Sequence, residues 1–379
     1  MSSEHLGWPD DADGDEFSTG LGWPDKREDP QVSEGFPQQP TDGADPVSRE
    51  TASREGTAAM KTAADVSRET APPNPAEIVP FDEHTTPLAR AVADQLEQQH
   101  RAQYGEPVAR QKNTRVMVVA NQKGGVGKTT TTVNIAAALA QLGQRVLVID
   151  LDPQGNASTA LAIEHRRGVN SSYDVLVDGM ALTDAVQPHA EIEGLFVVPA
   201  TIDLAGAEIE LVNQMSRESR LRKAILAHPL VETEPEGSEE RFDFVLVDCP
   251  PSLGLLTLNA LVSGAEVLIP IQAEYYALEG LGQLLETIEM VRAHLNPELV
   301  VSTILITMYD ARTRLSAGVA DEVREHFSEQ VLDTAIPRSV RVSEAPSYGQ
   351  SVMTYDPSSP GALSYLEAAR EMATKEISR

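Results

Sequence analysis

Short apolar runs recur along the second part of the chain, beyond about residue 115. They lie at 116–120, 145–149, 242–247, 266–271 and 300–308, with a further strand expected just before Pro337. Segments with helical periodicity separate these runs. Strands that alternate with helices are typical of a mostly parallel sheet with helices on both faces. The pattern therefore predicts an α/β fold, a doubly wound sheet, over residues 111–379.

Residues 1–110 show no such pattern. They are rich in Pro, Gly, Ser, Thr, Asp and Glu, and only residues 88–104 could form a short helix. This composition predicts a disordered acidic tail. Leu-Gly-Trp-Pro-Asp occurs at 6–10 and again at 21–25. A tryptophan in a solvated tail suits a peptide that docks in the groove of an unknown partner, and chance duplication in a low-complexity segment explains the repeat equally well.

Composition limits the classes of function. The net charge is −28 and the pI about 4.6, so the chain as a whole does not attract nucleic acid, and DNA would need a local basic patch. The single cysteine, Cys249, excludes a disulfide framework within the chain and fits a reducing cytoplasm. No apolar run reaches the roughly 20 residues that span a bilayer, and the N-terminus does not resemble a signal peptide.

A glycine-rich loop, residues 123–130, follows the run at 116–120 and precedes an apolar helical pattern at 133–140. In this strand–loop–helix arrangement, backbone N–H groups and the positive end of the helix converge on one point and bind anions. Lys128 is then expected to reach the outer phosphates of a nucleotide, and Thr129 to hold Mg²⁺. The alternative is an ordinary glycine-rich surface loop.

Carboxylates follow two other runs. Asp150 and Asp152 come directly after the run at 145–149, and Asp248 follows the run at 242–247. Ligands of parallel sheets bind at the carboxyl ends of the strands, so these side chains are expected near the phosphates. Asp248 would hold Mg²⁺ through water, whereas strand-end aspartates can also serve only as turn or cap residues.

The loop has one unusual feature. Gln122 stands where an ordinary phosphate loop has glycine, and an extra lysine, Lys123, follows it. Lys-Gly-Gly-Val-Gly-Lys-Thr-Thr resembles the deviant Walker A loop of the ParA/MinD family. The segments 150–156, 266–280, 309–314 and 337–346 also resemble ParA proteins of chromosomal type, so the resemblance extends from about Arg115 to Arg379.

This resemblance implies an ATPase that uses ATP and Mg²⁺ and forms an ATP-sandwich dimer, with Lys123 reaching into the second subunit. Lys123, Lys128 and Asp152 are the implied catalytic residues, and Asp152 positions the attacking water. Thr129 and Asp248 serve the metal, and Pro337 belongs to the adenine pocket. Arg312 and Arg341 match positions that grip DNA phosphates without reading sequence. The implied nucleotide contacts of the loop are Lys123, Gly124, Gly125, Val126, Gly127, Lys128, Thr129 and Thr130.

The function implied is DNA segregation: a cytoplasmic, nucleoid-associated ATPase that binds double-stranded DNA non-specifically and is released when a ParB-type centromere-binding protein stimulates hydrolysis. The rival is a MinD-like membrane ATPase that positions the division machinery. Residues 364–379 balance three acids against three bases and lack a basic face, so no stable membrane association is expected. An iron–sulfur relative would need two cysteines. A non-enzymatic scaffold that works through the tail is the remaining alternative.

A second repeat suggests a role for the gene rather than the peptide. Val-Ser-Arg-Glu-Thr occurs at 47–51 and at 66–70. Its codons permit GTTTCACGTGAAAC, which is its own reverse complement and resembles the centromere-like site of ParB-type proteins. We hypothesise that both places embed such a site, because a two-fold symmetric dimer binds two-fold symmetric DNA. The alternative is a duplicated linker with arbitrary codons.

Overall fold

The computed structural model describes residues 104–231, 240–274 and 277–375. Residues 1–103 of the tail, with both of its repeats and nearly all of the helix expected over 88–104, therefore lie outside the described residues. The division of the chain at residue 110 stays a prediction.

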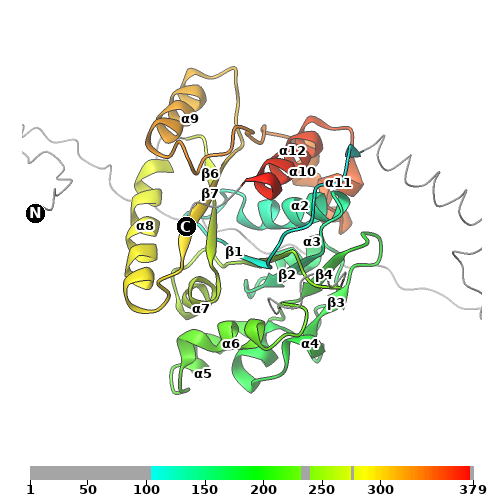
Figure 1. The fold of residues 1–379 in the computed structure, drawn as a ribbon, viewed down its shortest axis with the longest axis vertical. Helices are drawn as coiled ribbons and strands as arrows, with labels where there is room; N and C mark the ends of the chain where they lie inside the picture. Colours follow the sequence, from blue (N-terminus) through cyan, green and yellow to red (C-terminus); the bar gives the residue numbers. More distant parts are fainter. Residues whose placement is uncertain (1–103, 232–239, 275–276, 376–379) are drawn as a thin grey trace, which may run out of the picture. The chain divides into compact units, whose positions relative to one another are not determined.

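A seven-stranded sheet forms the centre of the described structure (Figure 1). Its order is β3-β4-β2-β5-β1-β6-β7, and all neighbours are parallel except β3 and β4. The predicted fold class, a mostly parallel doubly wound sheet, is thereby confirmed. The strands are β1 (Arg115–Val119), β2 (Val146–Asp150), β3 (Gln187–Pro188), β4 (Leu195–Val198), β5 (Phe244–Asp248), β6 (Glu266–Gln272) and β7 (Val300–Thr307).

Helices cover both faces of this sheet. One layer contains α2 (Lys128–Gln141), α3 (Asn156–Ala160), α10 (Val340–Glu344), η4 (Ala345–Tyr348), α11 (Val352–Tyr355) and α12 (Pro360–Thr374). The other contains the π-helical turn η2 (Asp174–Asp178), α4 (Leu182–Ala185), α5 (Leu204–Leu211), η3 (Arg217–Ser219), α6 (Arg220–Leu226), α7 (Leu255–Ser263) and α8 (Ala277–His294), and α9 (Arg314–His326) follows β7.

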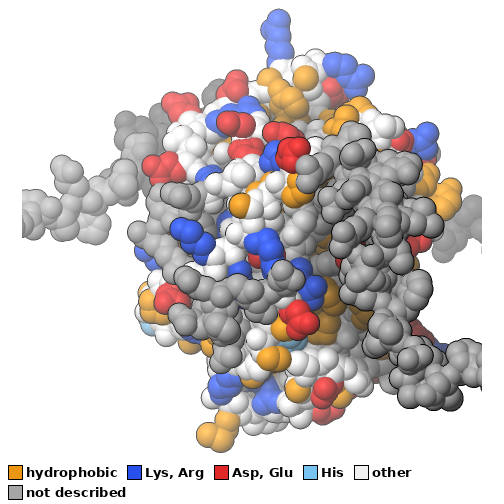
Figure 2. All heavy atoms as spheres, turned by 45° about the vertical axis from the view of Figure 1, so that its right-hand side comes forward, with side chains coloured by type: hydrophobic (Ala, Val, Ile, Leu, Met, Phe, Trp, Pro, Cys, Tyr) orange, Lys and Arg blue, Asp and Glu red, His pale blue; other side chains and the backbone are white. Residues whose placement is uncertain are grey.

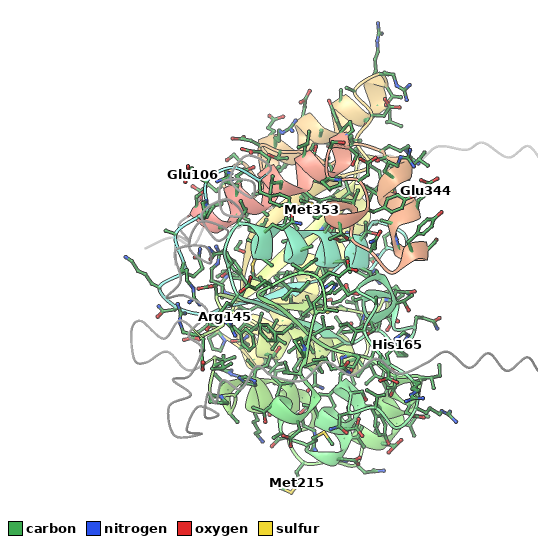
Figure 3. All side chains as sticks on the ribbon, turned by 90° about the vertical axis from the view of Figure 1, so that its right-hand side faces the viewer. Glu106, Arg145, His165, Met215, Glu344 and Met353 are labelled. Atoms are coloured by element: carbon green, nitrogen blue, oxygen red, sulfur yellow. The ribbon has the colours of Figure 1, made fainter. Side chains whose placement is uncertain are left out.

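Each strand supplies both layers because successive side chains point to opposite faces. Val118 belongs to the cluster beneath α7 and α8, whereas Met117 and Val119 belong to the cluster beneath α2 and α12. In Figure 3, Met353 of α11 lies in the layer that contains α2 and α12, while Met215, after α5, points away from the molecule. The strands therefore appear in the sequence as nearly continuous apolar runs.

The segment before β1 packs on the sheet domain. The Val108 amide donates to the Leu142 carbonyl at 3.0 Å, and the Arg110 Nε donates to the buried Asp243 carboxylate at 2.9 Å. The same carboxylate accepts from the Arg145 amide at 2.8 Å. Residues 104–110, which the sequence analysis assigned to the tail, thus contact the domain.

No regular strand precedes Pro337 in the described part of the chain, contrary to expectation. Residues 330–337 run beside β7 but form only the isolated bridges Ile304–Val331 and Tyr309–Pro337. Between these bridges, the Thr334 amide donates to the Glu371 carboxylate of α12 instead of to β7, and the Asp333 amide donates to the same carboxylate. This competition interrupts the ladder.

Candidate active site

The glycine-rich loop joins the carboxyl end of β1 to the first turn of α2. Gly125 has φ +75° and Gly127 has φ +92°, conformations that L side chains rarely adopt. Nothing lies within 4 Å of a Cβ built on Gly124 or Gly125, so the space above the loop is open. Within the described part of the chain, the amides of residues 124–130 find no acceptor. The loop therefore presents unsatisfied donors to an open space, as an anion cradle requires.

Lys128 points into this cradle from the start of α2. Its side chain is buried, and Nζ lies 3.5 Å from the Lys123 carbonyl oxygen. Burial lowers the pKa of Lys128, and the nearby Asp248, Cys249 and Asp152 act in the opposite direction. A buried ammonium with only a long hydrogen bond has an incomplete set of acceptors, which phosphate oxygens would complete.

Asp248 ends β5, the strand beside β1. Its Oδ2 accepts from the Thr129 hydroxyl at 2.7 Å and its Oδ1 from the Thr132 hydroxyl at 2.9 Å. Burial, followed by the charge of Asp150, raises the pKa of Asp248 to about 8. A buried carboxylate beside a threonine hydroxyl fits a divalent cation, since Mg²⁺ is usually bound through one or two carboxylates together with phosphates and water.

Asp150 is the last residue of β2, and Asp152 lies in the loop that follows it. Asp150 accepts from the Asp152 amide at 3.0 Å and from the amide and hydroxyl of Ser158 at 2.9 and 2.7 Å. Burial raises the pKa of Asp150 to about 6 despite these bonds. Asp150 thus organises the loop, whereas the carboxylate of Asp152 accepts one bond among the described residues, from the Gln154 amide at 3.0 Å.

Lys123 lies at the mouth of the loop rather than inside it. Its Nζ is 3.3 Å from Oε2 of Glu274, which follows β6, and its side chain is one-third exposed. The other carboxylate oxygen of Glu274 lies 3.7 Å from Arg338. The two lysines of the loop therefore have different environments: Lys128 faces the buried carboxylates, and Lys123 faces the surface.

Sequence reasoning missed three polar contacts of the loop and the helix α2 that follows it. Thr132 holds the second oxygen of Asp248. Thr307, at the end of β7, donates to the Val126 carbonyl at 2.8 Å. Asn134 accepts from the Val352 amide at 2.7 Å and so ties α2 to α11. Thr132 lies four residues beyond Lys128 and could have been found by helical spacing, but the other two pairs are distant in sequence.

A cavity of about 310 Å³ lies beside the first turn of α2. Thr129, Thr130 and Asn134 line one side, and Pro346 and Gln350 line the other. Pro337, expected in the adenine pocket, is not among its lining residues and bridges to Tyr309 at the end of β7.

The two arginines assigned to DNA are both paired with acids. The Arg312 guanidinium donates to both carboxylate oxygens of Asp310 at 2.9 Å, which lowers the pKa of Asp310 to about 2. Arg341, on α10, lies 3.2 Å from Glu344 and 3.4 Å from Asp356. On the face turned forward in Figure 2, basic and acidic side chains are likewise interspersed.

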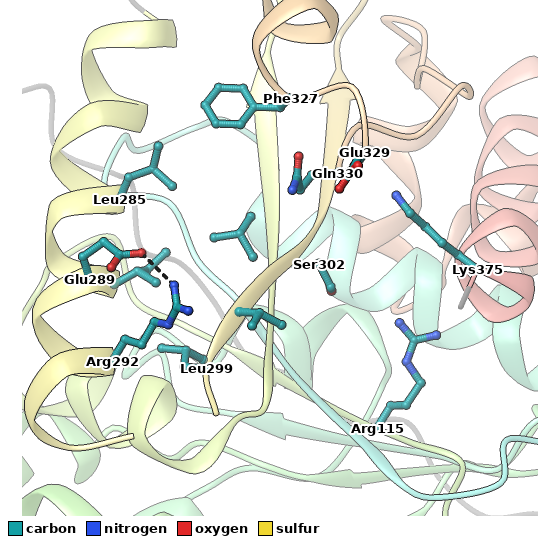
Figure 4. Close-up of a pocket in the computed structure, with 13 residues that line it drawn as sticks. Arg115, Leu285, Glu289, Arg292, Leu299, Ser302, Phe327, Glu329, Gln330 and Lys375 are labelled. Carbon is teal, nitrogen blue, oxygen red and sulfur yellow. Dashed lines mark hydrogen bonds and ion pairs between the residues drawn. The ribbon is translucent and has the colours of Figure 1, made fainter. Parts of the chain in front are cut away.

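A larger cavity, of about 600 Å³, lies at the opposite end of the sheet (Figure 4). The start of β7, α8 and Lys375 line it, and the Glu289–Arg292 ion pair spans 3.3 Å on its wall. Arg115 also lines this cavity, and its guanidinium forms an ion pair with the Glu266 carboxylate at an N–O distance of 2.7 Å. This cavity contains none of the predicted site residues.

A phosphate loop after β1, a buried aspartate at the end of the adjacent strand and a doubly wound sheet together define a P-loop nucleotide hydrolase. A family model described as an AAA domain matches residues 114–301. The sporulation initiation inhibitor protein Soj of Bacillus subtilis is 50% identical over 68% of this chain and 98% of its own length. The chromosome partitioning protein ParA of Myxococcus xanthus is 47% identical over 69% of this chain and 89% of its own length.

The chain belongs to the ParA/Soj family of chromosome-partitioning proteins and is an ATPase. The resemblance seen in its motifs is thereby confirmed. Among solved structures, cobyrinic acid a,c-diamide synthase from Mycobacterium smegmatis, with a bound ATP analog and magnesium, is 39% identical, covers 68% of this chain and 93% of its own, and has a TM-score of 0.56.

None of the helices in the described ranges has the length and apolar character needed to cross a membrane.

Proposed function

We propose that this ATPase segregates DNA through a cycle of ATP-dependent dimerisation, non-specific DNA binding and release by a ParB-type protein. The position of Lys123 carries the proposal. It belongs to the phosphate loop, yet its ammonium lies at the surface beside Glu274 while Lys128 occupies the interior. A cation at the rim is placed to serve a nucleotide held by a second subunit, in the manner of an arginine finger.

Within one subunit, the loop amides and Lys128 bind the phosphates of ATP, and Thr129 and Asp248 hold Mg²⁺. The metal supplies charge neutralisation of the phosphate oxygens when bound. Asp152 orients the attacking water, because it is buried near Lys128 and has accepting capacity left beyond its single hydrogen bond. The bound ATP analog and magnesium of the M. smegmatis structure support nucleotide and magnesium as the ligands of this site.

The adenosine part is expected in the cavity beside Thr129 and Thr130. This adds Pro346 and Gln350 to the nucleotide contacts. Pro337 is retained as an adenine contact only by resemblance to the family.

The rival function, a MinD-like membrane ATPase, would use an amphipathic C-terminal helix. The apolar side of α12 is occupied: Tyr365, Ala369 and Met372 are buried in the cluster that contains α2. Leu363 is the one large apolar side chain exposed on α12. The burial of this helix favours DNA over a lipid surface as the partner of the ATP-bound state.

Sedimentation of the protein with linear DNA or with anionic liposomes tests the two functions against each other. We expect co-sedimentation with DNA in ATP but not in ADP, and none with liposomes under either nucleotide. ATP-dependent liposome binding without DNA binding would overturn the proposal and support its rival.

The DNA contacts are tested by salt dependence. Arg312→Ala and Arg341→Ala should each weaken binding to any duplex and flatten the slope of log K against log salt by roughly one to two units per dimer. Asp310→Asn should strengthen binding, because it frees Arg312 from its ion pair while keeping an oxygen that accepts from the Arg312 amide. Arg324→Ala, on α9, is the matched control. Unchanged slopes, or losses confined to one sequence, would remove these arginines from the interface.

A further inference from the structure

Thr307 is the last residue of β7 and touches the phosphate loop from the side. Its hydroxyl donates to the Val126 carbonyl oxygen at 2.8 Å, and both residues are 2% exposed. Its methyl group packs against the loop, because a Cβ built on Gly127 would lie 3.9 Å from Thr307 Cγ2. This contact joins the edge strand β7 to the phosphate loop, over a sequence separation of 181 residues.

The bonded carbonyl belongs to the peptide unit that also contains the Gly127 amide. A trans peptide is planar, with its C=O and N–H pointing in opposite directions. Fixing the Val126 carbonyl toward Thr307 therefore fixes the Gly127 N–H away from β7. That N–H has no acceptor among the residues that the structure describes.

Glycine makes this peptide unusually free to rotate. Gly127 has φ +92°, and without a Cβ it can exchange this conformation for others at little cost. The loop itself contains no side-chain bond that would hold the Val126 carbonyl, so the orientation depends on the hydroxyl from β7.

We propose that Thr307 is a positioning residue for nucleotide binding: its hydroxyl orients the Val126–Gly127 peptide so that the Gly127 amide donates to a nucleotide phosphate. The inference rests on the proposed nucleotide site. Thr307 does not touch the nucleotide and acts only through the loop.

Three variants separate this role from simple packing. Thr307→Val keeps the shape and removes the hydroxyl, and Thr307→Ser keeps the hydroxyl and removes the methyl group. Thr303→Val removes another buried hydroxyl of β7, whose one side-chain hydrogen-bond partner among the described residues is Ser302. The probe is Mg·ADP, measured by equilibrium titration of the full-length protein, with thermal unfolding in the absence and presence of ADP.

We expect Thr307→Val to weaken ADP binding about tenfold or more, the typical effect of losing a hydrogen bond to a charged group. Its gain in Tm on adding ADP should shrink accordingly. Thr307→Ser and Thr303→Val should bind ADP like the wild type. A purely structural role predicts a lower Tm without ligand but an unchanged ADP affinity.

The inference is overturned if Thr307→Val binds ADP as the wild type does, or if Thr307→Ser is equally defective. Lys128→Ala in the same titration tests the underlying site. If Lys128→Ala also binds ADP normally, the proposed nucleotide site is wrong; if it loses ADP while Thr307→Val does not, only the role of Thr307 falls.

Discussion

Two lysines five residues apart illustrate how environment assigns a role to identical side chains. Lys128 is buried opposite Asp248, and its pKa is lowered by desolvation. Lys123 is paired with a carboxylate that is itself 46% exposed. An ion pair of this kind contributes roughly 0–1 kcal/mol, so Lys123 can leave Glu274 at little cost when another acceptor is offered.

Alanine substitutions should therefore separate the two lysines. Lys128→Ala should lose nucleotide binding, because the buried ammonium faces the phosphates of its own subunit. Lys123→Ala should still bind ATP but fail to dimerise, with hydrolysis reduced about a thousandfold or more, as for a missing arginine finger. Titration with a non-hydrolysable ATP analogue, together with sedimentation velocity, measures both properties. Equal ATP affinities of the two variants would contradict the assignment.

His228 should make the stability of the fold depend on pH. The imidazole is buried beside Phe242, at a centroid distance of 5.4 Å, and its Nδ1 accepts from the Leu230 amide at 3.1 Å. Burial lowers the pKa of His228 below its ordinary 6.5. Protonation would also turn Nδ1 into a donor and break the bond to Leu230.

The unfolded chain thus takes up this proton more readily than the folded one. The free energy of unfolding should fall as the pH drops below about 6.5, by at most about 1.4 kcal/mol per pH unit, until the folded pKa is passed. His228→Asn should reduce this loss, since an amide oxygen can accept from Leu230 without titrating. His326→Gln, at an exposed position of α9, is the control. Urea unfolding at several pH values measures the difference, and identical slopes for wild type and His228→Asn would refute it.

At the scale of elements, the end of β7 stores backbone strain. Met308 has φ +52°, a left-handed conformation that costs a residue with a Cβ roughly 1 kcal/mol or more. It follows Thr307, which holds the phosphate loop, and precedes the segment 309–313, which contains Arg312. The turn therefore sets the direction in which that segment leaves the sheet.

Glycine should accordingly be better tolerated than alanine at this position. Both substitutions remove the Met308 side chain, but only glycine adopts the positive φ without strain, so Met308→Gly should be more stable than Met308→Ala by about 1 kcal/mol. Met290, exposed within α8, provides the opposite case, because glycine there should be about 1 kcal/mol worse than alanine. Denaturant midpoints of the four variants measure these differences in stability. If alanine is more stable than glycine at both positions, Met308 is not strained.

The sequence was sufficient to predict elements whose signal is local. Buried parallel strands appear as apolar runs, and the aspartates that follow them lie at one edge of the sheet because the strands are parallel. Contacts between distant segments had no such signal. Thr307 donates to Val126, and Glu371 accepts from the Thr334 amide, which a regular strand would direct to β7. Both contacts depend on which elements become neighbours in the fold, and the local pattern of apolar and polar residues does not determine that arrangement.

At the scale of the whole molecule, the proposed function requires a chain with a net charge of −28 to approach a polyanion. The arginines assigned to DNA are neutralised by Asp310, Glu344 and Asp356 in the free subunit. Binding therefore requires either that phosphates displace these acids or that two subunits combine their cations. Both routes predict weak DNA binding by the monomer and a steep dependence on salt.

The second repeat lies outside the described residues and connects the molecule with its gene. Val-Ser-Arg-Glu-Thr at 47–51 and 66–70 contains no aromatic anchor and has mixed charge, so it offers little to a protein partner. If selection acts on the DNA, both copies should be encoded by the palindrome GTTTCACGTGAAAC, and a purified ParB-type protein should bind each copy with a preference over a synonymous sequence that breaks the inverted repeat. Unrelated synonymous codons at the two places would leave only a duplicated linker. Retention of the palindrome at both would connect this chain with chromosome segregation independently of its ATPase site.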